Sequence, residues 1–306
     1  MIKSKNKIIG FVNFGKNEEN NPTINRLTIE ARKLGYKTKI FNHYLFFLSF
    51  KKGEVSVYYD EQKINPNHFL AIIPTVSIFE NLPDHTFFLD CLKKIGIPII
   101  NNPNAIRLAK NKTHSLFQLA MSGLPITPSA VNFSQFKLKP LFNFIKKDDF
   151  ICKVNKSSLG RGVALIKSKI SLISIFELLA AKNIKPSTLL FQKYIHESKG
   201  KDIRIIVVGK KIVAIMERSA QGIDFRSNLS GGGEGKKIDR LSPEIKKISI
   251  KAIETLGLDY GGVDILISRR KPLILEVNAN PGLIIEEITR RNVSKKIIKY
   301  IVKKYS

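Results

Sequence analysis

Short apolar runs alternate with amphipathic segments over the first hundred residues, and this pattern indicates a layered α/β structure. The apolar segment 7–14 predicts a buried first strand, and the segment 24–34, which stops at Gly35, predicts a helix. A second helix is expected at 86–95. The further expected strands are 37–41, 55–59, 69–74 and 98–101. Because strands and helices alternate, we predict an N-terminal α/β domain over residues 1–101.

The pattern changes after residue 102 and predicts a second domain, 102–306, made of two parts. Two helical segments, at about 103–110 and 112–121, lead into a small α+β unit at about 125–194, and a C-terminal part at about 195–306 follows. A basic amphipathic helix is expected in its last residues. The other expected elements are strands 150–154, 163–166, 189–194, 203–208, 211–217, 262–267 and 273–278, and helices 171–182 and 243–256. The predicted fold class is α/β with α+β subdomains.

Composition is typical of a globular protein with a sizeable core, since 43% of the 306 residues are hydrophobic. The longest apolar run, Tyr44–Phe50, is far shorter than the roughly 18 to 20 residues of a membrane-spanning helix. The N-terminus lacks a signal-peptide pattern, so we expect a cytoplasmic protein with no membrane partner. Cys91 and Cys152 lie in apolar stretches, and we expect both to be reduced core residues.

Basic residues outnumber acidic ones by 52 to 25, which gives a net charge of +27. Such an excess favours contact with polyanions such as nucleic acid, ribosomes or nucleotides. The excess is spread over the whole chain, however, and a lysine-rich surface produced by a general compositional bias explains it about equally well. Charge alone therefore identifies no partner.

The strongest chemical signal is a pair of apolar strands, G-V-D-I-L-I and L-I-L-E-V-N, joined by the turn-like segment Ser268–Pro272. If the turn centres on Arg270, Asp264 lies opposite Glu276, and Asn278 shares the face of Glu276. Opposed carboxylates destabilise a strand pair unless a cation compensates, and magnesium with nucleotide phosphates is the best candidate. The alternative is a pair of solvated acids, but the apolar neighbours argue against it. The hairpin therefore predicts a phosphate-transfer site.

Basic side chains and glycines elsewhere in the chain are suited to holding a nucleotide. Lys153, Arg218 and Arg226 are candidate phosphate ligands, although each alone is equally well explained as a solvated surface residue. The glycine-containing segments Lys156–Gly162 and Ser230–Gly235 permit close backbone approach to a ligand, or are ordinary loops. The chain contains no Walker A, Rossmann glycine or G-x-S-x-G motif, so those common nucleotide-binding and hydrolase classes are excluded.

Several of these segments together resemble the RimK-like ATP-grasp ligases. The resemblance rests on K-D-I-R-I-I-V-V-G, on E-R followed by D-F-R-S-N-L, and on G-V-D-I-L with L-E-V-N-A-N-P-G-L, in that order. It continues through I-C-K-V and S-S-L-G-R-G-V and reaches weakly back to A-I-R-L-A-K-N-K. It implies an ATP-grasp fold with an N-terminal pre-ATP-grasp domain, a central lid and a C-terminal domain for metal and nucleotide.

The resemblance also implies roles for individual residues. Arg204 and Arg218 would be catalytic, offsetting charge on the phosphorylated intermediate, and Asp202 would hold the ribose. The resemblance implies two metal ions, Mg²⁺ or Mn²⁺. Their implied ligands are Asp264, Glu276 and Asn278. The other implied ATP contacts are Lys153, Ser158, Gly160, Lys193, Tyr194, Arg226, Ser227 and Asn228. The chain departs from the family at Lys193, where a glutamate is usual, and at Ile73–Ser77, where relatives tend to carry arginine and glycine; the second departure concerns the acceptor or amino-acid site.

The implied reaction transfers the γ-phosphoryl group of ATP to a carboxylate, and an amine then displaces phosphate to form an amide. The resemblance suggests L-glutamate as the amino acid and a protein or peptide carboxyl group, such as that of a ribosomal protein, as the acceptor, with a homo-oligomeric enzyme. Two alternatives remain open. One is a related ligase that acts on a small metabolite or a carrier-bound amino acid, and the other is a basic RNA- or ribosome-binding protein without turnover.

Overall fold

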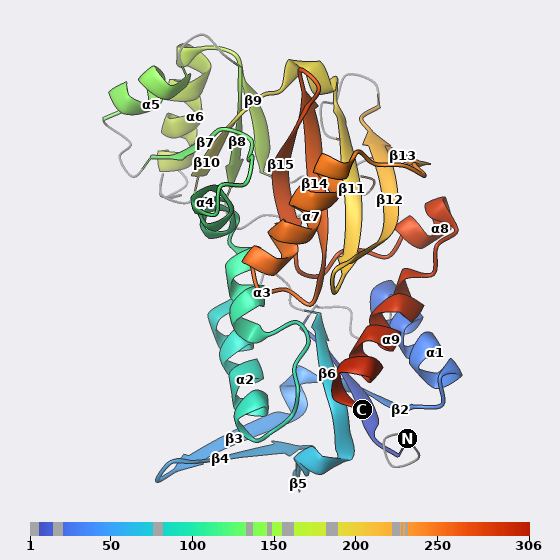
Figure 1. Cartoon of the computed structure of the whole chain (residues 1–306). Coiled ribbons are helices and arrows are strands. Elements are labelled where there is room, and N and C mark those ends of the chain that lie inside the picture. The colour runs from blue at the N-terminus through green and yellow to red at the C-terminus, as the bar shows by residue number, and fades with distance from the viewer. Residues whose placement is uncertain are drawn as a thin grey trace.

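The computed structural model describes residues 6–14, 21–75, 82–132, 137–145, 149–154, 162–181, 189–221, 227, 229 and 232–306. Three groups of elements are visible in Figure 1: a blue N-terminal part, a green part at upper left, and a yellow-to-red part around the largest sheet. None of the described helices combines the length and the apolar character that a bilayer-spanning segment requires.

A three-stranded parallel sheet organises the N-terminal part. Its strand order is β2-β1-β6, with β1 at Ile8–Asn13, β2 at Lys37–Asn42 and β6 at Phe69–Thr75. Helix α1, Pro22–Lys33, links β1 to β2, and α2, Leu82–Lys94, follows β6. These elements confirm the predicted α/β pattern. The strand expected at 98–101 is reduced to an isolated bridge, in which Ile99 pairs with Ile72 of β6.

A second, antiparallel sheet projects from the N-terminal part (Figure 1), and only one of its three strands, the middle one, is predicted from the sequence. It contains β3 (Phe46–Lys51), β4 (Glu54–Tyr59) and β5 (Gln62–Lys63), in that order. The pattern of β4 alternates and was recognised, whereas β3 falls in the continuous run Tyr44–Phe50. Two aromatic side chains of this run, Phe47 and Phe50, are exposed, so the run has no polar face that would reveal a strand.

Helices α3 (Pro103–Lys110) and α4 (Lys112–Met121) connect the N-terminal part to a four-stranded antiparallel sheet. The strand order of this sheet is β7-β10-β8-β9. The strands are β7 (Ser129–Val131), β8 (Phe150–Val154), β9 (Val163–Ile166) and β10 (Leu189–Lys193), with helices α5 (Lys139–Ile145) and α6 (Lys169–Ala181). We call this unit the lid sheet. Its sequence patterns predicted β8, β9, β10 and α6, but not β7 and α5, which are short.

The largest sheet has five antiparallel strands in the order β13-β12-β11-β14-β15. We call it the core sheet. Its strands are β11 (Lys201–Val208), β12 (Lys211–Ser219), β13 (Glu234–Lys237), β14 (Tyr260–Ser268) and β15 (Lys271–Asn278), and its helices are α7 (Pro243–Thr255), α8 (Ile285–Thr289) and α9 (Val293–Tyr305). The helix predicted in the last residues is α9, with its apolar positions buried and its lysines exposed.

Both faces of the core sheet are buried, and this explains its long apolar strands. Ile205 and Val207 of β11 belong to the same cluster as α7, while Ile206 and Val208 belong to the cluster that contains α9 and α1. The cluster around α9 also includes Phe11 of the first strand. The N-terminal part therefore shares its core with the core sheet. The predicted division at residue 101 remains a prediction.

Candidate functional site

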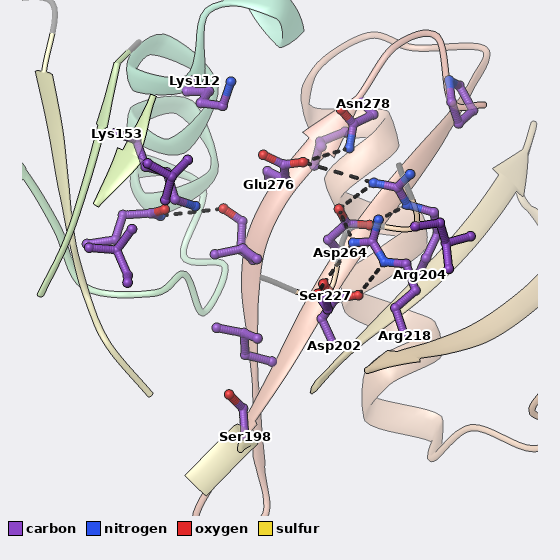
Figure 2. Close-up of a pocket in the computed structure, with 18 of the residues that line it drawn as sticks. Lys112, Lys153, Ser198, Asp202, Arg204, Arg218, Ser227, Asp264, Glu276 and Asn278 are labelled. Atoms are coloured by element: carbon purple, nitrogen blue, oxygen red, sulfur yellow. Dashed lines mark hydrogen bonds and ion pairs between the residues drawn. The ribbon is translucent and has the colours of Figure 1, made fainter. Parts of the chain in front are cut away.

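The face of the core sheet that carries α9 changes from apolar to charged along its strands. On β11 the residues of this face are Asp202, Arg204, Ile206 and Val208, because alternate residues point to the same side. The last two pack in the cluster around α9, whereas the first two lie beyond it. The charged end of this face is the candidate site, and Figure 2 shows its side chains gathered between the strands.

Strand register places opposite charges across from each other at this end. Asp202 of β11 pairs with Arg218 of β12, and Arg204 of β11 pairs with Asp264 of β14. Pairing across three neighbouring strands thus creates a network of two acids and two arginines. Directly opposed unlike charges stabilise strand pairs, so the register and the ion pairs support each other.

Hydrogen bonds join these four side chains into one unit. Arg204 donates to both carboxylate oxygens of Asp264, Nε to Oδ1 at 2.8 Å and Nη2 to Oδ2 at 2.6 Å. Arg218 donates to both oxygens of Asp202, at 2.7 and 2.8 Å, and to Oδ2 of Asp264 at 2.9 Å. The Ser227 hydroxyl donates to Asp202. Asp202, Arg218 and Asp264 are all buried, so this is a fixed, two-pronged arrangement rather than a surface ion pair.

The predicted pairing of the two acids is confirmed: Asp264 lies opposite Glu276. The turn itself differs from the prediction. Its central residues are Arg269 and Arg270, both with positive φ, and an irregularity after Asp264 restores the pairing that a turn centred on Arg270 would have given. Asn278 donates from Nδ2 to Oε1 of Glu276 at 3.2 Å, so the hairpin brings all three predicted oxygen-bearing side chains together.

Electrostatics at the site favours the charged forms of Asp264 and Arg218 but not that of Asp202. Burial disfavours ionisation of Asp264, but the Arg204 and Arg218 guanidiniums outweigh it and hold the pKa of its carboxyl below the usual range. Burial likewise opposes the charged form of Arg218, but Asp264 and Asp202 raise its pKa. For Asp202 burial dominates and, with the nearby Asp264 charge, raises the pKa against the pull of Arg218. Arg204 Nη2 lies 4.0 Å from Glu276 Oε1, so one guanidinium spans the two opposed acids.

A cavity of about 430 Å³ opens over these residues, between the core sheet and the lid sheet. Lys153 on β8 lines it from the lid side, and Figure 2 shows this side chain across from the acids. Burial lowers the pKa of Lys153, and the Glu276 charge works against that shift. Lys110 and Lys112 also line the cavity. Burial, together with Lys112, lowers the pKa of Lys110 to about 8.

Sequence reasoning gave no role to Lys110 and Lys112. They stand at the joint between α3 and α4, where Asn111 caps α4 by accepting a hydrogen bond from the His114 amide. The segment A-I-R-L-A-K-N-K carries part of the family resemblance. Its asparagine, flanked by two lysines, is the sequence signal for the start of a new helix at this joint. The structure brings both lysines to the same cavity as Lys153.

Strand β10 borders the other end of the cavity. The amides of Lys193 and Tyr194 donate to the carbonyls of Pro128 and Asp149, at 2.8 and 2.9 Å. Gln192, also on this strand, was not singled out from the sequence. Its Nε2 donates to Ser129 Oγ at 3.2 Å and lies 3.5 Å from the Leu275 carbonyl, whereas its buried Oε1 has no hydrogen-bond partner among the described residues. A buried acceptor of this kind is suited to a donor from a ligand.

The candidate residues therefore fall into two groups. The structure brings together at one cavity Lys153, Lys193, Tyr194, Asp202, Arg204, Arg218, Ser227, Asp264, Glu276 and Asn278. Ser158, Gly160, Arg226 and Asn228 lie outside the described residues. Both oxygens of Asp202 accept hydrogen bonds from Arg218, and its expected contact with the ribose stays a prediction. In this arrangement Asp202 fixes the position of Arg218.

A five-stranded core sheet facing a smaller lid sheet across a cavity with paired acids and lysines defines an ATP-grasp protein. The family model of the RimK-like ATP-grasp domain matches residues 109–301. A probable alpha-L-glutamate ligase from Legionella pneumophila (strain Corby) is 34% identical over 280 residues, which cover 91% of each protein. The chain belongs to the RimK-like ATP-grasp family and is an ATP-dependent ligase.

Solved structures show the same fold. The ATP-grasp ligase PsnB, complexed with minimal precursor, Mg and ADP, superimposes with a TM-score of 0.72 at 18% identity, covering 97% of both chains. The D-cycloserine synthetase DcsG superimposes with a TM-score of 0.74 at 13% identity, covering 98% of this chain and 100% of its own. At these identities the likeness establishes the fold, and the predicted ATP-grasp architecture is confirmed.

Proposed function

We propose that this protein is a magnesium- and ATP-dependent carboxylate–amine ligase that adds L-glutamate to the carboxyl terminus of a protein or peptide. The single observation that supports this most is the opposition of Asp264 and Glu276, with Arg204 reaching both and Lys153 across the cavity. The relatives named probable alpha-L-glutamate ligase support the choice of amino acid.

The donor set at the hairpin fits a hard divalent cation. Asp264 and Glu276 offer carboxylates and Asn278 offers an amide oxygen, which are the ligand types that Mg²⁺ or Mn²⁺ takes. These three residues would hold the metal, and we propose two ions. When bound, the ions would neutralise charge on the nucleotide phosphates. Because Arg204 donates to both oxygens of Asp264, this guanidinium and the metal would share that carboxylate.

The cavity accommodates ATP with its phosphates toward the lysines. Lys153, Lys110 and Lys112 supply positive charge on the lid side, and Ser227 together with residues at 158, 160, 226 and 228 completes the proposed phosphate and nucleotide contacts. At the β10 end the amides of Lys193 and Tyr194 are already used, so adenine recognition falls to their carbonyl oxygens and to the Oε1 atom of Gln192. An adenine amino group is a donor that matches these acceptors.

The proposed reaction needs no protein nucleophile. An acceptor carboxylate oxygen attacks the γ-phosphorus, the bond to the β-phosphate oxygen breaks, and ADP leaves; the amine nitrogen then attacks the acyl carbon, loses a proton, and inorganic phosphate departs. Arg218 is locked by Asp202 and offers fixed positive charge, while Arg204 is the guanidinium that can shift toward phosphate. Positioning and charge neutralisation carry the rate.

Exclusion of water is the second requirement, since an acyl phosphate hydrolyses readily. The lid sheet faces the core sheet across the cavity and is tied to it where the Thr127 and Ile274 amides donate to the carbonyls of Ile274 and Pro125, at 2.9 and 2.8 Å. Gln192 of β10 also reaches the Leu275 carbonyl of β15, so these contacts lie along β15, and we expect the lid sheet to close over the nucleotide about this side while the amine enters.

A second candidate within the enzyme class is a ligase that acts on a small metabolite or a carrier-bound amino acid. The structural likeness to a D-cycloserine synthetase favours keeping it, because the same fold occurs in an enzyme named for a small-molecule product. The non-catalytic alternative is less well supported, because it gives no account of two opposed acids, one of them buried, beside three lysines. A homo-oligomer and a ribosomal-protein acceptor are proposals that rest on the family alone.

The experiment is phosphate release from magnesium-ATP across a panel of amino acids, with and without acidic peptides that include ribosomal-protein C-termini. We expect release that requires both glutamate and a peptide, with a peptide mass gain of whole glutamyl residues. Release with amino acids alone, and no peptide product, would instead support a small-molecule acceptor. Equal rates of phosphate release by the Asp264→Asn variant and the wild type would contradict the assignment of the site.

A further inference from the structure

Helix α9 has two sharply different faces. Its apolar side is fully buried against the core sheet and α1 (Figure 1), through Ile297, Ile298 and Ile301. Its opposite side carries exposed lysines at 295, 296, 299 and 303. At about 100° per residue these four positions fall within an arc of about 100°, and they extend over about 12 Å of helix. We call this row the α9 lysine face.

The α9 lysine face is not explained by the lysine-rich composition of the chain. Four of the described helices have the same length of 13 residues, namely α2, α6, α7 and α9, and α6 contains one acid and one lysine. Helix α2 contains two acids and two lysines, and α7 contains two acids and three lysines, whereas α9 contains five lysines and no acid. From residue 288 to 306 the sequence has seven basic residues and no acidic one. The same compositional bias therefore produced balanced helices elsewhere.

Helix stability does not explain these lysines either. Lys295 and Lys296 stand in the first turn, where the helix dipole disfavours positive charge, and the exposed Arg290 and Arg291 precede them. Carboxylates of neighbouring elements are paired: Asp259 with Lys304, Glu286 and Glu287 with Arg26, and Glu30 with Lys33, while Glu30 also attracts Lys295. Within the described part of the chain, the lysines at 296, 299 and 303 form no ion pair.

We propose that the α9 lysine face binds the phosphate backbone of a nucleic acid. A straight row of cations about 12 Å long suits the closely and regularly spaced phosphates of a double helix. A membrane surface suits it less well, because the apolar side of α9 is occupied by the protein core and has nothing to insert. Figure 1 shows α9 on the side of the molecule away from the lid sheet, so nucleic acid and nucleotide can be bound together.

The test compares two triple variants with the same change in charge. One is Lys296→Gln, Lys299→Gln, Lys303→Gln in α9, and the other is Lys246→Gln, Lys247→Gln, Lys251→Gln in α7, where all three lysines are also exposed. Binding of a short fluorescent RNA duplex and of the matching DNA duplex is measured by anisotropy over a range of salt concentrations, without ATP. Melting temperature and stabilisation by magnesium-ATP are followed in parallel as folding controls.

We expect the α9 variant to bind about ten-fold more weakly and to lose about two to three units of the slope of log affinity against log salt, while the α7 variant changes little. Arginine at the three α9 positions should keep the binding. Equal weakening in both variants, or no weakening in either, overturns the proposal. Binding to phosphatidylserine vesicles and to poly-glutamate is measured as well. A loss of binding to either of these with duplex binding intact also overturns the proposal. The difference between the RNA and DNA arms identifies the nucleic acid, and since ATP is absent, the result is independent of the proposed ligase activity.

Discussion

One face of the core sheet carries apolar side chains at one end and charged side chains at the other. At one end Ile206, Val208 and Ala214 pack with α9 in a dry cluster. At the other end this face carries acids and arginines, of which Asp202, Arg218 and Asp264 are just as deeply buried. Since buried ion pairs contribute little net stability compared with apolar packing, the charged end is retained for chemistry.

Asp264→Asn is expected to have the largest effect, because it removes a charge at the charged end without changing its shape. We predict a fall in magnesium-ATP-dependent phosphate release of about 1,000-fold and the loss of thermal stabilisation by magnesium-ATP. Steady-state kinetics and a thermal-shift titration measure the two effects. Lys246→Gln, on the exposed side of α7, is the control and should leave both unchanged.

Arg218→Leu tests whether the charged end tolerates a missing partner. We expect a loss of about 3–5 kcal/mol in the free energy of unfolding, because Asp202 and Asp264 would both lose a buried donor. The double variant Arg218→Met, Asp202→Leu should recover much of this stability, since Asp264 keeps its hydrogen bonds from Arg204. Denaturant titration measures stability, and the double variant should still be inactive. Recovery of activity along with stability would show that Arg218 is only structural.

Lys110 offers a smaller, pH-dependent effect on the lid side. Its pKa of about 8 means that it loses its positive charge as the pH rises above that value, so its attraction for phosphate weakens. The KM for ATP should therefore rise by up to about ten-fold between pH 7 and pH 9. Arginine stays protonated over this range, so Lys110→Arg should flatten the profile. An unchanged slope in that variant would assign the titration to another group.

The pKa values of Lys110 and Asp264 are both lowered in the folded state, so for each group stability rises with pH, in two different pH windows. The folded-state pKa of Lys110 lies below the unfolded value of about 10.4, so the folded state is favoured as the pH rises from about 8 toward 10.4. The pKa of Asp264 is held below its unfolded value of about 3.9, so its contribution is present above that pH and is lost as the pH falls below it.

Ile206→Val provides the matched change at the apolar end and the smallest effect. Removal of one buried methylene should lower the free energy of unfolding by about 1 kcal/mol. Activity per folded molecule should not change, because the side chain packs toward α9 and not into the cavity. Denaturant titration and initial rates check both statements. A large loss of activity would mean that the two ends of the face are coupled.

Local patterns predicted much of this molecule, and non-local contacts account for most of what they missed. Asp264 and Glu276 belong to strands joined by a two-residue turn, so their meeting was readable from the sequence. The bond between Arg204 and Asp264 was not, because β11 and β14 are neighbours only after a long connection that contains β12, β13 and α7. Lys110 was missed for the same reason: its proximity to the cavity depends on how α3 meets the core sheet.

The packing of α9 against α1 has a consequence for how the protein is made. The first strand and α1 share a cluster with Ile297, Ile298 and Ile301, so the N-terminal sheet has a bare apolar side until residues 293–305 have left the ribosome. Domains generally fold in order as they are synthesised. Here the beginning of the chain must wait for its last helix, and a transcript that is cut short before this helix should yield a product dependent on chaperones.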